Sequence, residues 1–258
     1  MRYHHVWIRE DHAYVVILGD LHFGAHNFDE KKLKGYLNWA DDHKENTIMP
    51  FIGDMINAAT KDSKSSYYEE EIHGDKQIDG LLDILMPHKI KYTCSVLGNH
   101  EDRIWKHSGH DVCRTYSEKL GIKYLGISGV LFVSVGVRSN RNSPVSTYAI
   151  YLNHTTGGGS TPGGKMNRVN QLRLICEGCD IYAGGHNHGL GAFKAAVEET
   201  DLIKHKVRVR PVYLVNTGSC LTYGGYAEKM QLPPSHSGFA TIWLAGNDKK
   251  HKDVHVDI

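Results

Sequence analysis

Short apolar segments, rich in β-branched residues and bounded by glycine, alternate along much of the chain with segments of helical periodicity. Strand-like and helix-like segments in alternation favour a layered α/β architecture. We therefore predict an α/β fold. The expected strands cover residues 14–18, 47–52, 92–97, 148–152 and 181–183, and the expected helices cover residues 29–44, 77–86, 111–120 and 165–177.

The pattern changes after Gly191, where only strand-like segments follow, over residues 193–199, 202–209, 212–217 and 239–245. This change predicts a second β-sheet. The chain has no internal repeat, no linker rich in Pro, Gly or Ser, and no break in composition. We therefore assign residues 1–258 to a single domain.

The composition argues against several classes of protein. The 258 residues carry 30 Lys and Arg against 29 Asp and Glu, and a net charge of +1 is unlike that of a protein that coats nucleic acid. No apolar run reaches the roughly 18 residues of a membrane span, and the amino terminus lacks a signal peptide's apolar core. Five cysteines do not suggest a secreted disulfide framework. We expect a cytoplasmic protein that does not associate with membranes.

Histidine is the outlier, because the chain has 18 of them and imidazole is the commonest metal ligand in proteins. Several histidines belong to polar clusters that directly follow the expected strands. In an α/β sheet, ligands bind beyond the carboxyl ends of the strands, so clusters far apart in sequence can converge there. The five clusters are Gly19-Asp20-Leu21-His22, Gly53-Asp54-Met55-Ile56-Asn57, Gly98-Asn99-His100-Glu101, Asn153-His154 and Gly185-His186-Asn187-His188.

The spacing within these clusters predicts where their side chains point. The glycines before Asp20, Asp54, Asn99 and His186 allow the chain to turn sharply. In Asp20-x-His22 and His186-x-His188, alternation along an extended strand end would put both side chains on one side, toward one ion. Carboxylate, amide and imidazole ligands without thiolate suit Mn, Fe, Zn or Ni.

In this order, the clusters resemble the calcineurin-like metallophosphoesterase superfamily, with its pattern D-x-H, G-D, G-N-H-[DE], H and G-H-x-H. The loop of residues 154–165, with the segments 216–219 and 226–228, is more loosely similar to the small phage and prophage members. The resemblance implies two mixed β-sheets packed as a sandwich with flanking helices, a four-layer αββα fold. It also implies two divalent transition-metal ions bridged by a carboxylate, with Mn²⁺ as the first choice. In this assignment Asp20, His22 and His188 hold one ion, Asn99, His154 and His186 hold the other, and Asp54 bridges them.

By the same resemblance His100 is the catalytic residue, which donates a proton to the leaving oxygen or stabilises the leaving alkoxide. Its alternative role is to hydrogen-bond a metal ligand. Asn57 stands where the protein-phosphatase branch has an aspartate, and it can orient His100. Ala58 stands where that branch has a phosphate-binding arginine. Glu101 either orients His100 or is an ordinary surface acid.

Three basic residues are candidates for binding substrate: Lys165, Arg168 and Arg103. The run Gly159 to Lys165 fits G-x-x-x-x-G-K, but Met166 replaces the Ser or Thr that a nucleotide-binding P-loop needs. Along the expected strand 202–209, alternate basic residues from Lys204 to Arg210 would share one face. That face could follow a phosphate backbone, or it could simply be solvated and protect a strand edge.

The function expected from the sequence is a phosphoesterase that hydrolyses phosphodiester bonds of a nucleotide or nucleic acid with water activated by two metal ions. A phosphomonoesterase acting on a small molecule or a nucleic-acid end is the alternative. A scaffold that has lost catalysis is disfavoured, because every ligand position and His100 are filled. The natural substrate and the oligomeric state are left open.

Overall fold

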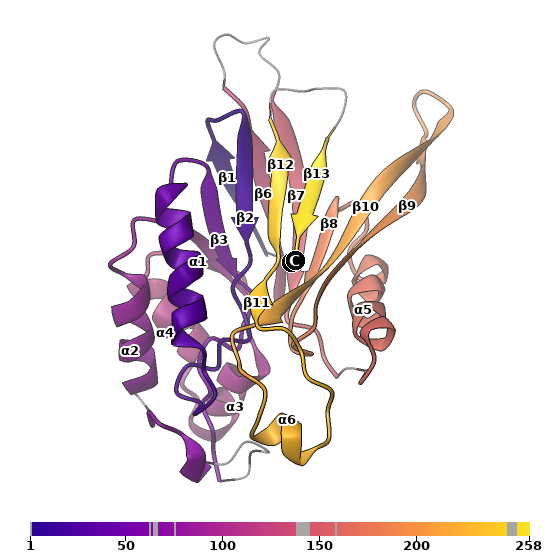
Figure 1. Ribbon diagram of the computed structural model, residues 1–258. Coiled ribbons are helices and arrows are strands. Elements are labelled where there is room, and N and C mark those ends of the chain that lie inside the picture. The colour runs from indigo at the N-terminus through magenta and orange to yellow at the C-terminus, as the bar shows by residue number, and fades with distance from the viewer. Residues whose placement is uncertain are drawn as a thin grey trace.

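Two mixed β-sheets lie face to face in the computed structural model, and helices cover their outer faces (Figure 1). The structure describes residues 2–61, 63, 67–74, 76–137, 145–157, 159–246 and 252–258. The layers confirm the predicted α/β class and the αββα arrangement that the family resemblance implies. Within the described ranges no helix is long and apolar enough to cross a membrane.

The first sheet has the strand order β1-β6-β7-β8-β10-β11, with β9 paired to β10. Strands β1 and β6, β7 and β8, and β8 and β10 pair in parallel, whereas β6–β7, β9–β10 and β10–β11 are antiparallel. The bounds are Arg2–Ile8 (β1), Ser128–Val135 (β6), Ser146–Asn153 (β7), Ile181–Gly184 (β8), Leu190–Asp201 (β9), Lys206–Ser219 (β10) and Gly238–Phe239 (β11).

The second sheet has the order β13-β12-β2-β3-β4-β5, and its strands from β2 to β5 run parallel. All five residues of β3 are buried, as expected for a central strand covered on both faces. The bounds are His12–Val16 (β2), Thr47–Phe51 (β3), Lys91–Ser95 (β4), Lys123–Tyr124 (β5), Thr241–Ala245 (β12) and Val254–Asp257 (β13).

The core between the sheets and the core under the helices use alternate residues of the same strands. In β2, Val15 packs toward the first sheet, whereas Val16 packs toward the helices. Helices α1, α2 and α4 cover the second sheet, and α5 covers the first (Figure 1). The helices are Glu30–Asp42 (α1), Lys76–Leu85 (α2), Asn99–Ser108 (α3), Val112–Lys119 (α4), Pro162–Gln171 (α5) and Tyr226–Lys229 (α6), and 3₁₀ turns cover Tyr67–Glu69 and Leu172–Leu174.

The strand expected at residues 202–209 begins later than predicted, and of the two alternatives for its basic residues the structure favours a solvated face. Residues 202–205 form the turn of a long hairpin, so Lys204 lies outside β10. Arg208 pairs with Glu199 of β9 at 2.6 Å and is therefore not free for a phosphate.

The position of this hairpin also argues against the other alternative, a basic face that follows a phosphate backbone at the site. Thr217 of β10 pairs with Leu190 of β9, which follows closely after His188 in the sequence. Lys206 lies 11 residues before Thr217 along β10. At about 3.3 Å per residue, the basic end therefore lies about 36 Å from the end near His188. Figure 1 shows this hairpin projecting from the sandwich, with its turn away from α6. These basic residues are not placed to hold a substrate at the histidine cluster.

Candidate metal centre

The segments that follow β2 and β3 run side by side beyond the ends of their strands. The backbone N–H of Asp20 donates to the carbonyl of Gly53 at 3.0 Å, and that of His22 donates to the carbonyl of Asp54 at 3.0 Å. This pairing continues the parallel register of the two strands into their loops. It brings the first and second polar clusters of the sequence into contact.

The backbone at these positions is unusual. Five candidate ligands have a positive φ, a region that non-glycine residues rarely adopt and that is concentrated at functional sites: Asp20 (48°), His22 (49°), Asp54 (52°), His186 (72°) and His188 (51°). Their side chains are therefore aimed by left-handed turns and not by alternation along an extended strand. For His186 and His188 the alternation argument also gives the wrong result, because the two side chains join different groups.

The glycines of the motifs serve mainly for close approach. Gly53 does adopt a positive φ of 94°, as a sharp turn requires. Gly98 does not, but a Cβ atom there would lie 2.1 Å from the backbone nitrogen of Asp54 and 2.3 Å from its Oδ1. Only glycine at position 98 lets Asn99 and His100 approach the Asp54 carboxylate.

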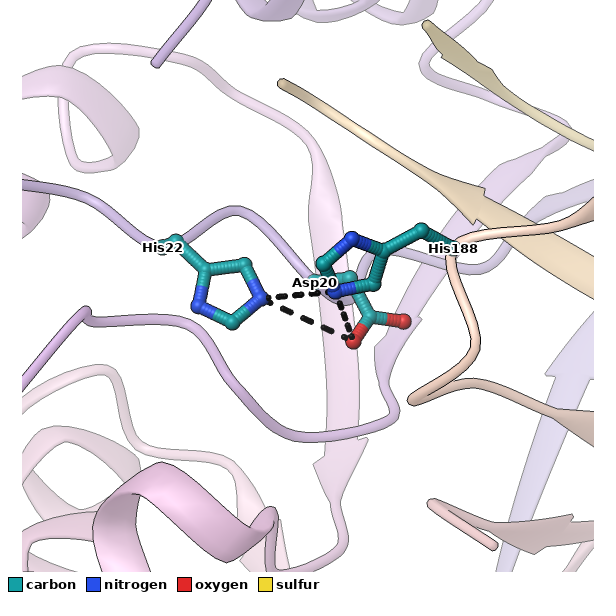
Figure 2. A group of neighbouring side chains, drawn as sticks. All are labelled: Asp20, His22 and His188. Atoms are coloured by element: carbon teal, nitrogen blue, oxygen red, sulfur yellow. Dashed lines mark hydrogen bonds and ion pairs between the residues drawn. The ribbon is translucent and has the colours of Figure 1, made fainter. Parts of the chain in front are cut away.

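Asp20, His22 and His188 form the first group of candidate ligands, and Figure 2 shows their polar atoms pointing toward one another. The Nε2 atoms of His22 and His188 are 3.0 Å apart, and the Oδ1 atom of Asp20 is 3.9 Å from the former and 3.5 Å from the latter. Asp20 is fully buried, and its Oδ1 atom has no hydrogen-bond partner. A buried carboxylate oxygen without a donor, facing two imidazole nitrogens, fits a bound cation.

Asp54, His154 and His186 form the second group, and Asn99 joins them. The Nε2 atom of His154 lies 3.1 Å from Oδ2 of Asp54 and 3.0 Å from Oδ1 of Asn99. The same Asn99 oxygen lies 2.6 Å from Nδ1 of His186. On its other side, Nδ1 of His154 donates to the carbonyl of Ile52 at 2.8 Å, which aims Nε2 into the group.

Asp54 connects the two groups. Its Oδ2 atom is 3.1 Å from His154 and also 3.9 Å from Nε2 of His22, a member of the first group. Its other oxygen, Oδ1, accepts from the backbone N–H of His100 at 2.8 Å. All seven side chains proposed as ligands from the sequence are thus brought together, and the donor set is consistent with two ions that share the Asp54 carboxylate.

Comparisons with known proteins give matches in structure and none in sequence. No family model matches the chain, and no curated protein matches it. In structure, it is similar to calcineurin-like phosphoesterases. The calcineurin-like phosphoesterase YfkN of Bacillus subtilis matches over 96% of this chain and 91% of its own, with 15% identity and a TM-score of 0.46. The NAD nucleotidase NadN of Haemophilus influenzae matches over 95% of this chain but only 49% of its own, with 9% identity and a TM-score of 0.46.

Burial and neighbouring charges determine the protonation of the candidate ligands in the protein without metal. Burial, with a contribution from Asp54, raises the pKa of Asp20 to about 7. Burial opposes the charge on His154, but the carboxylates of Asp54, Asp20 and Glu101 outweigh it and raise its pKa to about 10. Burial and the neighbouring histidines lower the pKa of His22, and that of His188 falls to about 3. His154 is therefore cationic at neutral pH, whereas His22 and His188 are neutral.

His100 lies at the edge of both groups. Its Nδ1–H donates to the backbone carbonyl of Asn57, so Nε2 faces Oδ2 of Asp54 at 3.8 Å. The Asn57 backbone therefore orients His100, whereas the Asn57 side chain, which was expected to do so, donates to Glu70 instead. Burial lowers the pKa of His100. The proximity of His100 to His22 and Asp54 also makes it a possible ligand on geometry alone.

Two buried carboxylates support this arrangement. Glu101 is completely buried and accepts from the backbone N–H groups of Asp54 (3.0 Å) and Met55 (2.7 Å), so it is not a surface acid, and it supports the backbone near His100 without a hydrogen bond to the imidazole among the described residues. Glu70 was missed. Its Oε1 atom accepts from the side chains of Asn57 and Gln77, each at 2.9 Å, and from the backbone N–H of Ala59 at 2.8 Å. A single acid in a charged segment carries no sequence signal for such a role.

The candidate substrate residues divide between two cavities. Lys165 and Arg103 line a cavity of about 510 Å³ that also contains His22, His100 and His188. Arg103 additionally donates to the carbonyl of Ala58 at 3.1 Å. Arg168 does not share this cavity but lines a second one, of about 370 Å³, on the side of His154. Within the glycine-rich loop, Gly158 lies outside the described residues.

Proposed function

We propose that the protein is a dinuclear metal-dependent phosphoesterase that hydrolyses phosphodiesters. The observation that carries the proposal is the pair of buried ligand groups joined by Asp54, which lie at the wall of a cavity that also contains the cationic side chains Lys165 and Arg103. A negatively charged substrate suits that cavity. Carboxylate, amide and imidazole donors without thiolate suit a labile divalent ion, and we propose Mn²⁺ as the metal.

Each residue has a definite part in this proposal. Asp20, His22 and His188 would hold one ion, Asn99, His154 and His186 would hold the other, and Asp54 would serve both. The chemistry that such ions would supply is activation of a water molecule at neutral pH and neutralisation of the charge on the phosphoryl oxygens. Lys165 and Arg103 bind the substrate on the side of the large cavity.

His100 takes up a proton released from the attacking water and passes it to the leaving oxygen, so the proton lost by the water balances the one gained by the leaving group. Because its Nδ1–H is held by the Asn57 carbonyl, Nε2 is the atom that carries the exchanged proton. His100 lines the large cavity, so the leaving group departs into that cavity. Glu70 and Glu101 fix the backbone of residues 54–59 against which His100 is held.

A phosphomonoesterase is the second candidate function, and one observation favours it. The guanidinium of Arg103 lies in the same cavity as His100 and contacts Ala58, the residue that replaces the usual phosphate-binding arginine. A guanidinium at this place can clamp the doubly charged phosphoryl group of a monoester.

The two candidates are separated by rates on paired substrates. The metal-free protein is titrated with Mn²⁺, Fe²⁺, Zn²⁺ or Ni²⁺, and hydrolysis of bis-p-nitrophenyl phosphate and p-nitrophenyl phosphate is measured. A higher kcat/KM for the diester supports the proposal, and a much higher value for the monoester with every metal supports the alternative. Asp54→Asn should abolish hydrolysis of both substrates, whereas Asp79→Asn, a change at an exposed residue of α2, is the matched control. Metal binding without hydrolysis of either ester would indicate a scaffold and refute both enzyme functions.

A further inference from the structure

A second cavity also reaches the candidate metal centre. Asn99 and His154 line it, and so does Arg168 of α5. Its walls carry a set of apolar residues from separate parts of the chain: Leu97, Ile127, Leu172 and Ile175. His100, Lys165 and Arg103, which line the large cavity, do not line this second one.

Asn99 is the residue at which the two cavities meet, since it lines both. Its Oδ1 atom lies within hydrogen-bond distance of His154 on one side and of His186 on the other. A phosphoryl group bound at the metal centre is therefore next to both cavities. A phosphodiester carries two ester groups on its phosphorus, whereas a monoester has only one to accommodate.

The lining of the second cavity suits a flat apolar group. Ile127 and Ile175 are 74% and 61% exposed, although both are large aliphatic side chains. Such residues at the wall of a cavity gain by covering an apolar ring. Arg168 is exposed and hydrogen-bonds to the neutral Gln171 side chain at 3.3 Å, so its planar cation can stack on a ring or meet a phosphate.

We propose that this second cavity is the subsite for the non-leaving ester group of a phosphodiester, and that this group is a planar ring such as a nucleobase or an aryl group. The ring lies against Ile127 and Ile175, while the leaving group occupies the large cavity beside His100. This inference rests on the proposed function, and it identifies the class of diester on which the enzyme acts.

The test compares two diesters of equal charge and identical leaving group. Bis-p-nitrophenyl phosphate has a ring on both ester positions, whereas methyl p-nitrophenyl phosphate has a methyl group in place of the second ring. The wild-type protein should favour the two-ring diester. In the double variant Ile127→Ala/Ile175→Ala, the ratio of the two kcat/KM values should fall about tenfold, because the variant loses much of the apolar surface that covers the ring.

Leu174→Ala is the matched control. Leu174 is 85% exposed and precedes Ile175, but it does not line the cavity, so its removal should leave the ratio unchanged. Because all three residues are largely exposed, the variants should fold normally. An unchanged ratio in the double variant, with both diesters hydrolysed, would overturn the inference while leaving the proposed function intact.

A binding measurement separates this inference from the proposed function. Calorimetry gives the Kd of diphenyl phosphate and of methyl phenyl phosphate for the Mn²⁺-loaded protein. Tighter binding of diphenyl phosphate that is lost in the double variant supports the subsite even if neither diester is hydrolysed, in which case only the proposed function fails. Equal binding of the two compounds by the wild-type protein would refute the subsite.

Discussion

When metal binds at pH 8, the side chains of the protein should release about one proton per chain, and His154 should be its source. A metal ligand must be a neutral imidazole, so a histidine that is cationic in the metal-free protein loses its proton when an ion binds. In the protein alone, Nε2 of His154 faces two acceptors, Oδ2 of Asp54 at 3.1 Å and Oδ1 of Asn99 at 3.0 Å. Its Nδ1–H is already donated to Ile52, so the ring must carry protons on both nitrogens to satisfy these contacts.

The expected stoichiometry follows from the pKa values. With a pKa of about 10, His154 is about 99% protonated at pH 8. The pKa values of Asp20 and Glu101, raised to about 7 by burial, leave each about one tenth protonated at that pH. His22 and His188 are already neutral and release nothing. The side chains therefore release about 1.2 protons at pH 8, nearly all from His154. Ionisation of a water activated by the ions would add to this number equally in the wild-type protein and in a variant that lacks His154.

Calorimetric titration of metal-free protein with Mn²⁺ in buffers of different ionisation enthalpy measures this release directly. His154→Gln, which keeps a neutral ligand oxygen, should bind metal more weakly and release about one proton fewer. His107→Gln, a change at an exposed histidine of α3, is the control and should behave like the wild-type protein. Metal binding at pH 8 without proton release would show that His154 is neutral in the metal-free protein or is not a ligand, and would refute the reasoning.

Three further predictions concern the protein without substrate. The pKa of His154 in the folded protein is raised above its unfolded value of 6.5. Its contribution to stability is therefore complete below pH 6.5 and disappears as the pH rises to about 10. Urea unfolding of EDTA-treated protein across this range should show the free energy of unfolding decline. Gly98→Ala should cost about 1–3 kcal/mol of stability and weaken metal binding, because its Cβ would displace Asp54; unchanged metal binding would contradict this. Glu70→Ala should cost about 3 kcal/mol by leaving three donors without their acceptor, and its thermal unfolding should be compared with that of the exposed-residue control Glu71→Ala.

The sequence predicts the strands that carry the site better than those that complete the sheets. Strands β2, β3, β4, β7 and β8 were expected within a few residues of their observed bounds, because each is apolar and ends in a polar cluster. The sequence did not predict strand β1, because three of its first four residues are exposed and the other, His4, is half-buried, as is usual at a sheet edge where no apolar pattern is required. Strand β6 has an apolar run but no polar cluster after it, and such a run alone does not distinguish a strand from a buried helix.

The types of the candidate ligands could be predicted, but the backbone that aims them could not. Left-handed turns at Asp20, His22 and Asp54 contradict local preference, and only the surrounding tertiary contacts can impose them. The same holds for Glu101, whose burial depends on two N–H groups of a segment 47 and 46 residues away. Long-range hydrogen bonds of this kind leave no local periodicity to detect.

Asn57 and Ala58 depart from the protein-phosphatase pattern, but neighbouring groups take over the roles of the residues that they replace. Asn57 replaces a carboxylate, but a backbone carbonyl orients His100, and any residue at position 57 supplies that carbonyl. Ala58 stands where the protein-phosphatase pattern has an arginine. Arg103 of α3, however, donates to the Ala58 carbonyl, and its guanidinium lines the large cavity together with His100. The lack of an arginine at position 58 therefore no longer argues against a monoester. The preference for a diester depends instead on the second cavity at Asn99, and for this reason the ratio between the two-ring and one-ring diesters is the more decisive measurement.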